Sequence, residues 1–197
     1  MHDDPRTFKP LWRWELLLFA LVLVLAIAAN LVLRIPSPAV SGVLSVVLLV
    51  LAVALAAALI VPLITSKGRD SENTLRSVEG RDLVLLESVG ETPVTVRVEE
   101  SERRQTSIDA ARAKSRLTPK AVLTPDASRW LGRELRVAVD LVADDGRVYR
   151  AGFVPRRFGA TLRPALLDLR SRGEVAVVPV EVSGGGDRAR LAVDVRL

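Results

Sequence analysis

Two long apolar runs dominate the first third of the chain. Leu16–Leu33 carries no charged residue, and thirteen of its 18 positions are Leu, Val, Ile or Phe. The second run, Ala39–Ile64, contains only small or apolar residues apart from Ser41 and Ser45. A helix needs roughly 20 such residues to span the hydrocarbon core of a bilayer. The pattern therefore predicts a transmembrane hairpin over residues 16–64, with spans at about 13–33 and 41–64.

The segments that flank these spans predict their orientation. The stretch "RIPSPAVSG" is typical of a tight turn, because Pro36 and Pro38 disfavour helix. The connecting loop has one basic residue, Arg34, whereas the tail over residues 1–15 and the segment after the second span have several: Arg6, Lys9, Arg13, Lys67, Arg69, Arg76 and Arg81. Basic residues stay on the cytoplasmic side of a membrane. We therefore expect a multi-pass protein of the inner membrane of a bacterial-type cell, with both termini in the cytoplasm. Trp12 and Trp14 suit an interfacial anchor.

Two features of the apolar runs have alternative interpretations. Ala26-Ile27-Ala28 resembles the cleavage site of a signal peptide, although three acidic residues, Asp3, Asp4 and Glu15, are atypical of one. The second span would return the rest of the chain to the cytoplasm in either case. Ala52 with Ala56, and Ala54 with Ala58, have the spacing of closely packed membrane helices, which an alanine-rich helix also produces by composition.

After a polar linker over residues 65–82, a soluble β-rich domain is expected over residues 83–197. "ELRVAVDLVADDG" alternates with period two, which places Leu135, Val137, Val139 and Leu141 on one side. The Asp-Asp-Gly turn leads into "RVYRAGFVP", an antiparallel partner. Further strands are predicted in "LVLLE", "PVTVRVE", "KAVLTPD", "EVAVVPVEV" and "RLAVDVRL", with Pro179 at an edge or bulge. Residues 100–116 are interpreted as an exposed helix or loop without a core face.

One helix is predicted between these strands. Four apolar residues at i, i+4, i+8 and i+11 form a single stripe: Phe158, Leu162, Leu166 and Leu169. Arg156, Arg163 and Arg170 follow at seven-residue intervals on the opposite side. Pro164 is expected to kink or split the helix, and Gly173 to end it. The predicted fold is a small, partly closed β-barrel (HIRAN-, SH3- or OB-like) of six or seven strands with one helix, behind the membrane hairpin.

A strand that ends in "GFVPR" (Gly152–Arg156), followed by a helix, by "VAVVPVEV", by a glycine-rich loop and by "LAVDVRL", resembles the HIRAN domain over about residues 119–197. The resemblance implies a small β-barrel with a helix and, as in some members, capture of single-stranded DNA ends. The family's acidic, proline-containing segment is reduced here to "LTPDASRWLGRELRVAV", in which Pro125 and Val137-Ala138-Val139 are possible counterparts. The resemblance therefore bears more on the fold than on DNA binding.

Composition excludes several kinds of chemistry. The chain has no cysteine and one histidine, His2 in the N-terminal tail, which excludes disulfides, thiolate zinc sites, cysteine nucleophiles and histidine-based triads in the folded part. Asp144 and Asp145 could be paired acids or cation ligands, but a turn explains them. Gly184–Gly186 could cradle a phosphate, but a hairpin loop explains it. We expect a protein that is not an enzyme and uses no metal or cofactor.

Arginines provide the candidate binding site. Residues 67–197 hold 24 of the 28 Lys and Arg and 20 of the 23 Asp and Glu, a net charge of 24 − 20 = +4. The candidate residues for an anion or nucleic acid are Arg156, Arg157, Arg163 and Arg170, with Trp130 and Tyr149 as stacking groups. A solvated arginine face is the alternative. A second basic group would suit an anionic lipid surface: Arg103, Arg104, Arg112, Lys114 and Arg116.

Three hypotheses of function result. The first is a non-catalytic binding or scaffolding module, anchored in the bilayer and facing the cytoplasm, whose partner is unknown and could be another membrane protein. The alternative is a membrane-tethered protein that binds single-stranded nucleic-acid ends through the arginines. The third is a subunit of a larger membrane complex in which the helix pair is the working part.

Overall fold

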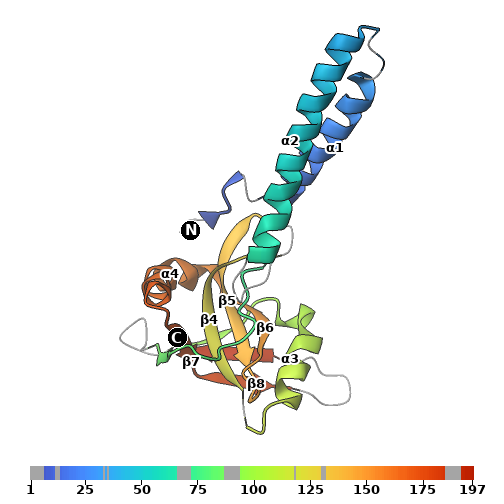
Figure 1. The fold of residues 1–197 in the computed structure, drawn as a ribbon. Coiled ribbons are helices and arrows are strands. Elements are labelled where there is room, and N and C mark those ends of the chain that lie inside the picture. Colours follow the sequence, from blue (N-terminus) through green and yellow to red (C-terminus); the bar gives the residue numbers. More distant parts are fainter. Residues whose placement is uncertain are drawn as a thin grey trace. The chain divides into compact units, whose positions relative to one another are not determined.

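The computed structural model describes residues 7–11, 14–32, 34, 36–65, 72–86, 94–117, 119–129, 132–184 and 192–197. Its contacts divide the chain into two compact units. Residues 9–67 form a helical unit, and residues 68–197 together with residues 1–8 form a mixed unit of strands and helices (Figure 1). Thr7 and Phe8, which precede the apolar runs, thus belong to the C-terminal unit.

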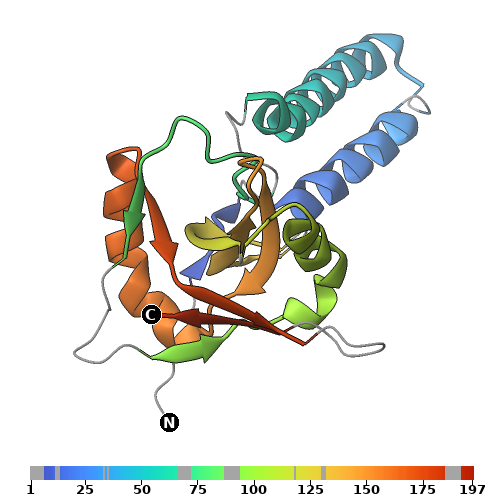
Figure 2. The ribbon, with the colours of Figure 1, turned by 90° about the horizontal axis from the view of Figure 1, so that it is seen from below.

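Two sheets build the C-terminal unit. The larger has the order β1-β5-β4-β7-β2, and β6 pairs with the edge of β5 that β1 also uses. Its strands are β1 (Thr7–Phe8), β2 (Leu83–Leu85), β4 (Lys120–Ala127), β5 (Glu134–Val142), β6 (Val148–Phe153) and β7 (Val175–Val178). The smaller sheet has the order β3-β9-β8, with β3 (Thr95–Arg97), β8 (Val180–Ser183) and β9 (Ala192–Arg196) (Figure 2). The pairings are antiparallel except that of β2 with β7, so the larger sheet is mixed.

The main core lies between the two sheets and two α-helices. These helices are α3 (Gln105–Ala113), preceded by the 3-10 turn η2 (Ser101–Arg103), and α4 (Arg156–Ser171). The core joins side chains of both sheets to those of both helices, among them Val96, Ile108, Val139, Leu162, Leu166 and Val195. Because β5 alternates, its residues Val137, Val139 and Leu141 all enter this core, as the period-two pattern predicts.

Several expectations for this unit are wrong. In the described residues it has nine strands rather than six or seven and two α-helices rather than one, and its two sheets form no closed barrel. The segment expected to lack a core face forms α3, in which Ile108 and Ala111 are fully buried. The alanine gives that helix its second core position, and a search for large apolar residues overlooks it. The helix α4 also runs unbroken through Pro164, which lies on its exposed side.

The other face of the larger sheet is covered by residues that the sequence pattern assigns to the linker. Leu75 and Val78 are buried and pack against Val122, Val142 and Val175. Asn73 donates from its side-chain amide to the carbonyls of Pro125 and Asp126 at 3.0 and 3.1 Å. Residues 72–82 are therefore part of the folded unit.

Turns and prolines behave mostly as the pattern predicts. The β5–β6 hairpin is confirmed, and Gly146 in its turn has φ = 72°, which favours glycine. The β8–β9 hairpin is also present. The predicted strand "EVAVVPVEV" is divided at Pro179: β7 belongs to the larger sheet and β8 to the smaller one. A proline lacks the N–H that a continuous ladder needs, so the chain changes sheet at this residue.

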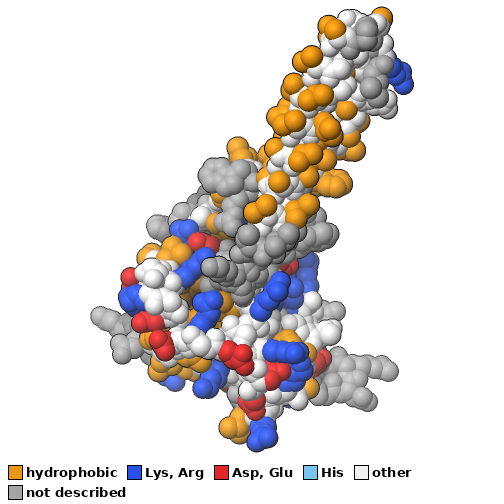
Figure 3. All heavy atoms as spheres, viewed as in Figure 1, with side chains coloured by type: hydrophobic (Ala, Val, Ile, Leu, Met, Phe, Trp, Pro, Cys, Tyr) orange, Lys and Arg blue, Asp and Glu red, His pale blue; other side chains and the backbone are white. Residues whose placement is uncertain are grey.

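The helical unit contains α1 (Glu15–Val32) and α2 (Pro38–Thr65), which contact each other. In α2, the 20 residues Ala39–Ala58 have a mean hydropathy of 2.7 and are long and apolar enough to cross a membrane. The apolar stretch of α1, Leu16–Val32, is shorter. Hydrophobic side chains cover the visible surface of both helices (Figure 3).

Each of these helices is half-buried along one stripe. On α1 the stripe consists of Leu18, Val22, Leu25, Ala28 and Ala29, and Trp14 directly before the helix continues it; on α2 it consists of Ser41, Ser45, Leu48, Ala52, Leu55 and Ala56. The three- and four-residue spacing marks one face of each helix. Ala52 and Ala56 thus lie on the packed face, whereas Ala54 and Ala58 are exposed. The remaining faces expose large apolar side chains such as Phe19 at 65% and Val43 at 69%.

Candidate functional site

The segment "GFVPR" joins β6 to α4, and its residues have structural roles. Gly152 lies where β6 approaches Glu99: Phe153 and Glu99 exchange backbone hydrogen bonds of 2.8 and 3.0 Å. A Cβ atom on Gly152 would lie 2.3 Å from the carbonyl oxygen of Glu99, so no side chain fits. Pro155 has φ = −53° and precedes the first helical residue, Arg156. The motif is therefore explained by the fold itself.

A bulge in β6 explains the position of Phe153. Val139 pairs with Gly152 and Asp140 pairs with Arg150, so Ala151 is the extra residue. The extra residue turns Phe153 to the same face of the sheet as Arg150. The fully buried Phe153 ring lies 4.9 and 5.4 Å from the guanidinium carbons of Arg136 and Arg150. Both distances are within the range of cation–π contacts.

A buried ion pair lies beside this ring. The side chain of Asp140 is completely buried and that of Arg150 is 4% exposed. Arg150 donates through Nε to Asp140 and through Nη2 to the hydroxyl of Thr74, and the Thr124 hydroxyl donates to Asp140 at 2.8 Å. These bonds pair the two charges and fix the segment around Thr74 to the sheet. Nη1 of Arg150 is buried without a hydrogen bond in the described part of the chain and lies 3.9 Å from a carboxylate oxygen of Glu72. We assign this cluster a structural role, because its groups are buried and bind one another.

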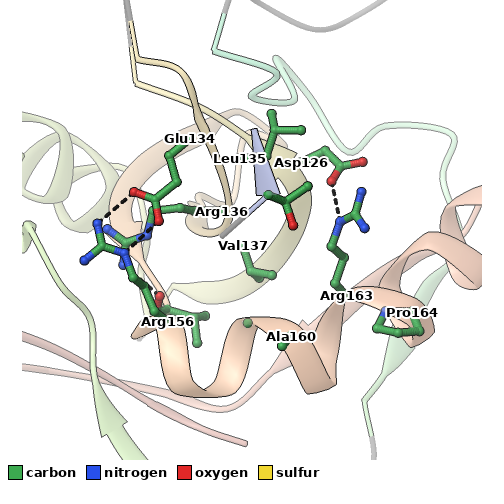
Figure 4. A pocket seen from close by; sticks show the side chains of 12 residues that line it. Asp126, Glu134, Leu135, Arg136, Val137, Arg156, Ala160, Arg163 and Pro164 are labelled. Carbon is green, nitrogen blue, oxygen red and sulfur yellow. Dashed lines mark hydrogen bonds and ion pairs between the residues drawn. The ribbon is translucent and has the colours of Figure 1, made fainter. Parts of the chain in front are cut away.

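A pocket of about 190 Å³ lies between α4 and the first half of β5. Figure 4 shows its two ends, each formed by an arginine of α4 and a carboxylate of the sheet. The lining between them is mainly apolar: Leu135, Val137, Val154, Ala160 and Pro164. Thr7 of β1 also lines the pocket, because β1 pairs with β5 at Leu135.

The first arginine–carboxylate pair is Arg156 with Glu134. Nε and Nη2 of Arg156 donate to the two carboxylate oxygens, each at 2.7 Å, which is the bidentate geometry of a strong pair. The hydrogen bond from Arg156 to Glu134 is the main reason why the pKa of Arg156 is raised above its ordinary value. A raised pKa keeps the guanidinium charged at every physiological pH, so this pair does not open by loss of the arginine's proton.

The second pair is Arg163 with Asp126, two helical turns further along α4. Nε of Arg163 donates to Asp126 at 2.7 Å. Asp126 has φ = 55°, in the left-handed region, and belongs to the β4 bulge between Thr124 and Ala127. The Asn73 amide holds the carbonyls of this bulge. The bulge thus aims the Asp126 side chain at α4.

Arg136 lines the pocket, and its two carboxylate partners are residues that do not line it. It donates to Glu99, to Glu100 at 3.1 Å and to the carbonyl of Val154 at 3.0 Å. Its side chain is 9% exposed, and its Nε is buried without a hydrogen-bond partner in the described part of the chain. Glu100 also binds Arg129, and this hydrogen bond raises the pKa of Arg129.

The structure brings together only two of the six candidate residues. Arg156 and Arg163 line the pocket. Arg157 lies over the ring of Phe158 at 4.8 Å, and Arg170 is exposed on the last turns of α4. Tyr149 packs against the core, and its hydroxyl accepts a hydrogen bond at 2.7 Å from Lys114, which follows α3. Trp130 lies outside the described residues.

Three charged residues of the pocket are not among those predicted from the sequence: Asp126, Glu134 and Arg136. They lie on β4 and β5, and nothing in their spacing relates them to α4. A signal for Asp126 was available, since an acidic residue after Pro125 interrupts an apolar strand. The weaker candidates for chemistry serve turns: Asp144 accepts from the Arg116 backbone N–H at 2.8 Å, and Asp145 from that of Arg147 at 3.1 Å. Among the described residues, no group of acidic or histidine side chains is arranged to hold a metal ion.

Comparison with known protein families, curated proteins and solved structures gives no match for this chain. Its function must therefore be inferred from the pocket, from the apolar helices and from the connection between the two units along the chain.

Proposed function

We propose that this protein is a non-catalytic binding module, anchored by α1 and α2 in a bacterial-type inner membrane, with its C-terminal unit and its N-terminus in the cytoplasm. The pocket between α4 and β5 is the binding feature of the module. The partner is either a soluble ligand or another membrane protein that presents a segment to this pocket.

The observation that carries the proposal is the pairing of β1 with β5. Thr7 pairs with Leu135 and Phe8 with Glu134, inside the C-terminal unit. Residues 7–8 and the C-terminal unit must then lie in the same compartment. The chain between them can cross a membrane only an even number of times. Because α2 is long enough for one crossing, α1 is the natural second crossing.

The surfaces of the two helices support this arrangement. Both expose large apolar side chains on every described face except the stripe where they pack, and such helices are stable in lipid rather than in water. The 18 residues of α1 span about 27 Å, slightly less than a typical core of about 30 Å, a mismatch that bilayers accommodate by thinning. The excess of basic residues outside the connecting loop favours cytoplasmic ends.

The side chains in the pocket support binding rather than catalysis. Its ionisable groups are three arginines and the two carboxylates that pair with Arg156 and Arg163. An arginine does not exchange its proton near neutral pH, and paired carboxylates are poor general bases.

The resemblance of residues 119–197 to HIRAN domains also remains a proposal. It rests on the segment "GFVPR" and on the helix that follows it.

Labelling of single cysteines tests the topology, because the chain has no native cysteine. We expect a membrane-impermeant maleimide to label Ser37→Cys, between the helices, in intact spheroplasts. Ser171→Cys at the end of α4 should be labelled only after lysis. The two variants carry the same chemical change and differ only in position, so each is the control for the other. Labelling of Ser171→Cys in intact spheroplasts, or of neither variant before lysis, would contradict the proposal.

The nucleic-acid alternative stays a prediction. It needs an aromatic platform beside the arginines, and Tyr149 is bonded to Lys114 on the other helix instead. The full chain in lipid nanodiscs should not bind a short single-stranded oligonucleotide at ~50 mM salt, where phosphate contacts are strongest. Binding with a steep salt dependence would favour the alternative.

A further inference from the structure

The apolar floor of the pocket and its exposed donors point to one kind of ligand. In both pairs the arginine side chain is more exposed than that of its partner: Arg156 is 48% exposed against 24% for Glu134, and Arg163 37% against 22% for Asp126. A ligand that enters from solvent therefore has more access to the arginine side chains than to the carboxylates.

The guanidinium of Arg163 has hydrogen-bond donors that its ion pair with Asp126 does not use. Asp126 engages its Nε, and both terminal nitrogens are without a hydrogen bond in the part of the chain that the structure describes. Asp126 thus acts as a positioning residue that holds the guanidinium and leaves its end free. Two neighbouring guanidinium nitrogens match the two oxygens of a carboxylate.

The pocket wall also offers an acceptor. Pro164 has no N–H, so the carbonyl of Ala160 lacks the donor that a helix normally supplies four residues later. Both residues line the pocket. The residues that line this pocket therefore include an arginine with unused donors, an apolar floor and a residue whose carbonyl lacks its helical donor.

We infer that this pocket binds the C-terminal end of a polypeptide whose last side chain is apolar. The terminal carboxylate lies on the end of Arg163, the last amide N–H donates to the carbonyl of Ala160, and the side chain covers Val137 and Leu135. This inference rests on the proposed binding-module function and names its ligand class.

Charge and shape favour a carboxylate over a phosphate. The lining holds three arginines, and each is already paired with a carboxylate of the same unit, so little positive charge is left over for a ligand, which suits a monoanion better than a dianion. A nucleic-acid end needs in addition a ring on which its base stacks, and none of the described lining residues is aromatic.

Peptide binding to the full chain in lipid nanodiscs tests the inference. The probe is a fluorescein-labelled hexapeptide that ends in Val-Leu with a free carboxylate, and its partner is the same peptide with an amidated end. We expect the free acid to bind and the amide to bind about 10- to 100-fold more weakly, the value of a charge-assisted hydrogen-bond pair. Inorganic phosphate and a short oligo-dT, added as competitors at millimolar concentration, should not displace the free acid.

Variants of α4 locate the site. Arg163→Gln should weaken binding of the free acid to the level of the amide, whereas Arg170→Gln, on the same helix outside the pocket, should leave it unchanged. Pro164→Ala supplies the missing N–H to the Ala160 carbonyl and should weaken binding about tenfold. Because that change removes a proline from a helix interior, the variant should fold at least as well as the parent, so a loss of binding cannot be ascribed to misfolding.

Equal affinity for acid and amide, displacement by phosphate or oligo-dT, or no binding of the acid would overturn the inference. So would an unchanged affinity in Pro164→Ala. None of these outcomes alters the cysteine labelling. A protein with the expected topology but no peptide binding would therefore remain a membrane-anchored module that uses another surface.

Discussion

At the residue scale, Gly152 shows how little freedom the backbone has beside the pocket. The carbonyl of Glu99 lies where its side chain would begin, and the hydrogen bonds between Glu99 and Phe153 keep that approach close. By contrast, Gly159 lies within α4, and a Cβ atom there would meet no atom of the surrounding structure within 4 Å. The two glycines therefore differ in whether the fold requires them.

We expect Gly152→Ala to destabilise the C-terminal unit by about 3 kcal/mol, because β6 and Glu99 must separate to admit the methyl group. Gly159→Ala, the same chemical change, should stabilise it by up to about 1 kcal/mol, since alanine favours helix over glycine. Thermal unfolding of the full chain in detergent, followed by near-UV circular dichroism, measures both. Similar unfolding temperatures for the two variants would refute this account of the "GFVPR" segment.

At the element scale, the packed stripe of α2 distinguishes alanines that composition alone treats as equal. Ala52 is half-buried on the face of α2 that packs against α1, whereas Ala54 lies on another face of α2 and is exposed. Small side chains on such a face let two helix backbones approach closely in lipid.

Ala52→Leu should therefore separate the helices and lower the stability of the helical unit by about 1–3 kcal/mol, as overpacking does elsewhere. Ala54→Leu adds the same atoms on the outside and should have no such effect. Titration with sodium dodecyl sulfate, followed by far-UV circular dichroism, compares the two midpoints. If Ala54→Leu shifts the midpoint as much as Ala52→Leu, then the packed face is assigned wrongly.

Much of the element order is predictable from the sequence, for identifiable reasons. The β5–β6 hairpin follows from strict alternation and an Asp-Asp-Gly turn, and the core stripe of α4 from helical spacing. The core contribution of α3 is hidden because one of its two buried residues is only an alanine, Ala111. The pocket cannot be read from the sequence, since Asp126 and Glu134 meet α4 only after a bulge and a sheet have formed.

At the scale of the whole molecule, the two-residue strand β1 bears on the proposed membrane topology. It is too short to be recognised in the sequence, yet it returns residues 7–8 to the C-terminal unit. If the helical unit lies in a membrane, as we propose, this pairing requires an even number of crossings, independently of the distribution of charge.

We expect a disulfide to form in the variant Thr7→Cys/Leu135→Cys when isolated membranes are oxidised, since these residues are opposite each other in the register of β1 and β5. Thr7→Cys/Arg147→Cys is the control, because Arg147 lies beyond the other end of β5, where it is bridged to Ser77. Gel mobility before and after reduction reports the crosslink. Absence of the crosslink in the first pair, or equal yields in both, would argue against the β1 pairing and hence against the even number of crossings.

The ion pair of Asp140 and Arg150 has a consequence for tracing the descent of this protein. A change at either position alone would strand a charge in the interior, at a cost of about 3–5 kcal/mol, whereas replacing both by apolar residues together is often tolerated. Substitutions at positions 140 and 150 are therefore expected to occur together during evolution. In distant homologues, the two positions should covary. An Asp–Arg pair, or two apolar residues, at these positions would then support homology even where the overall sequence identity is low.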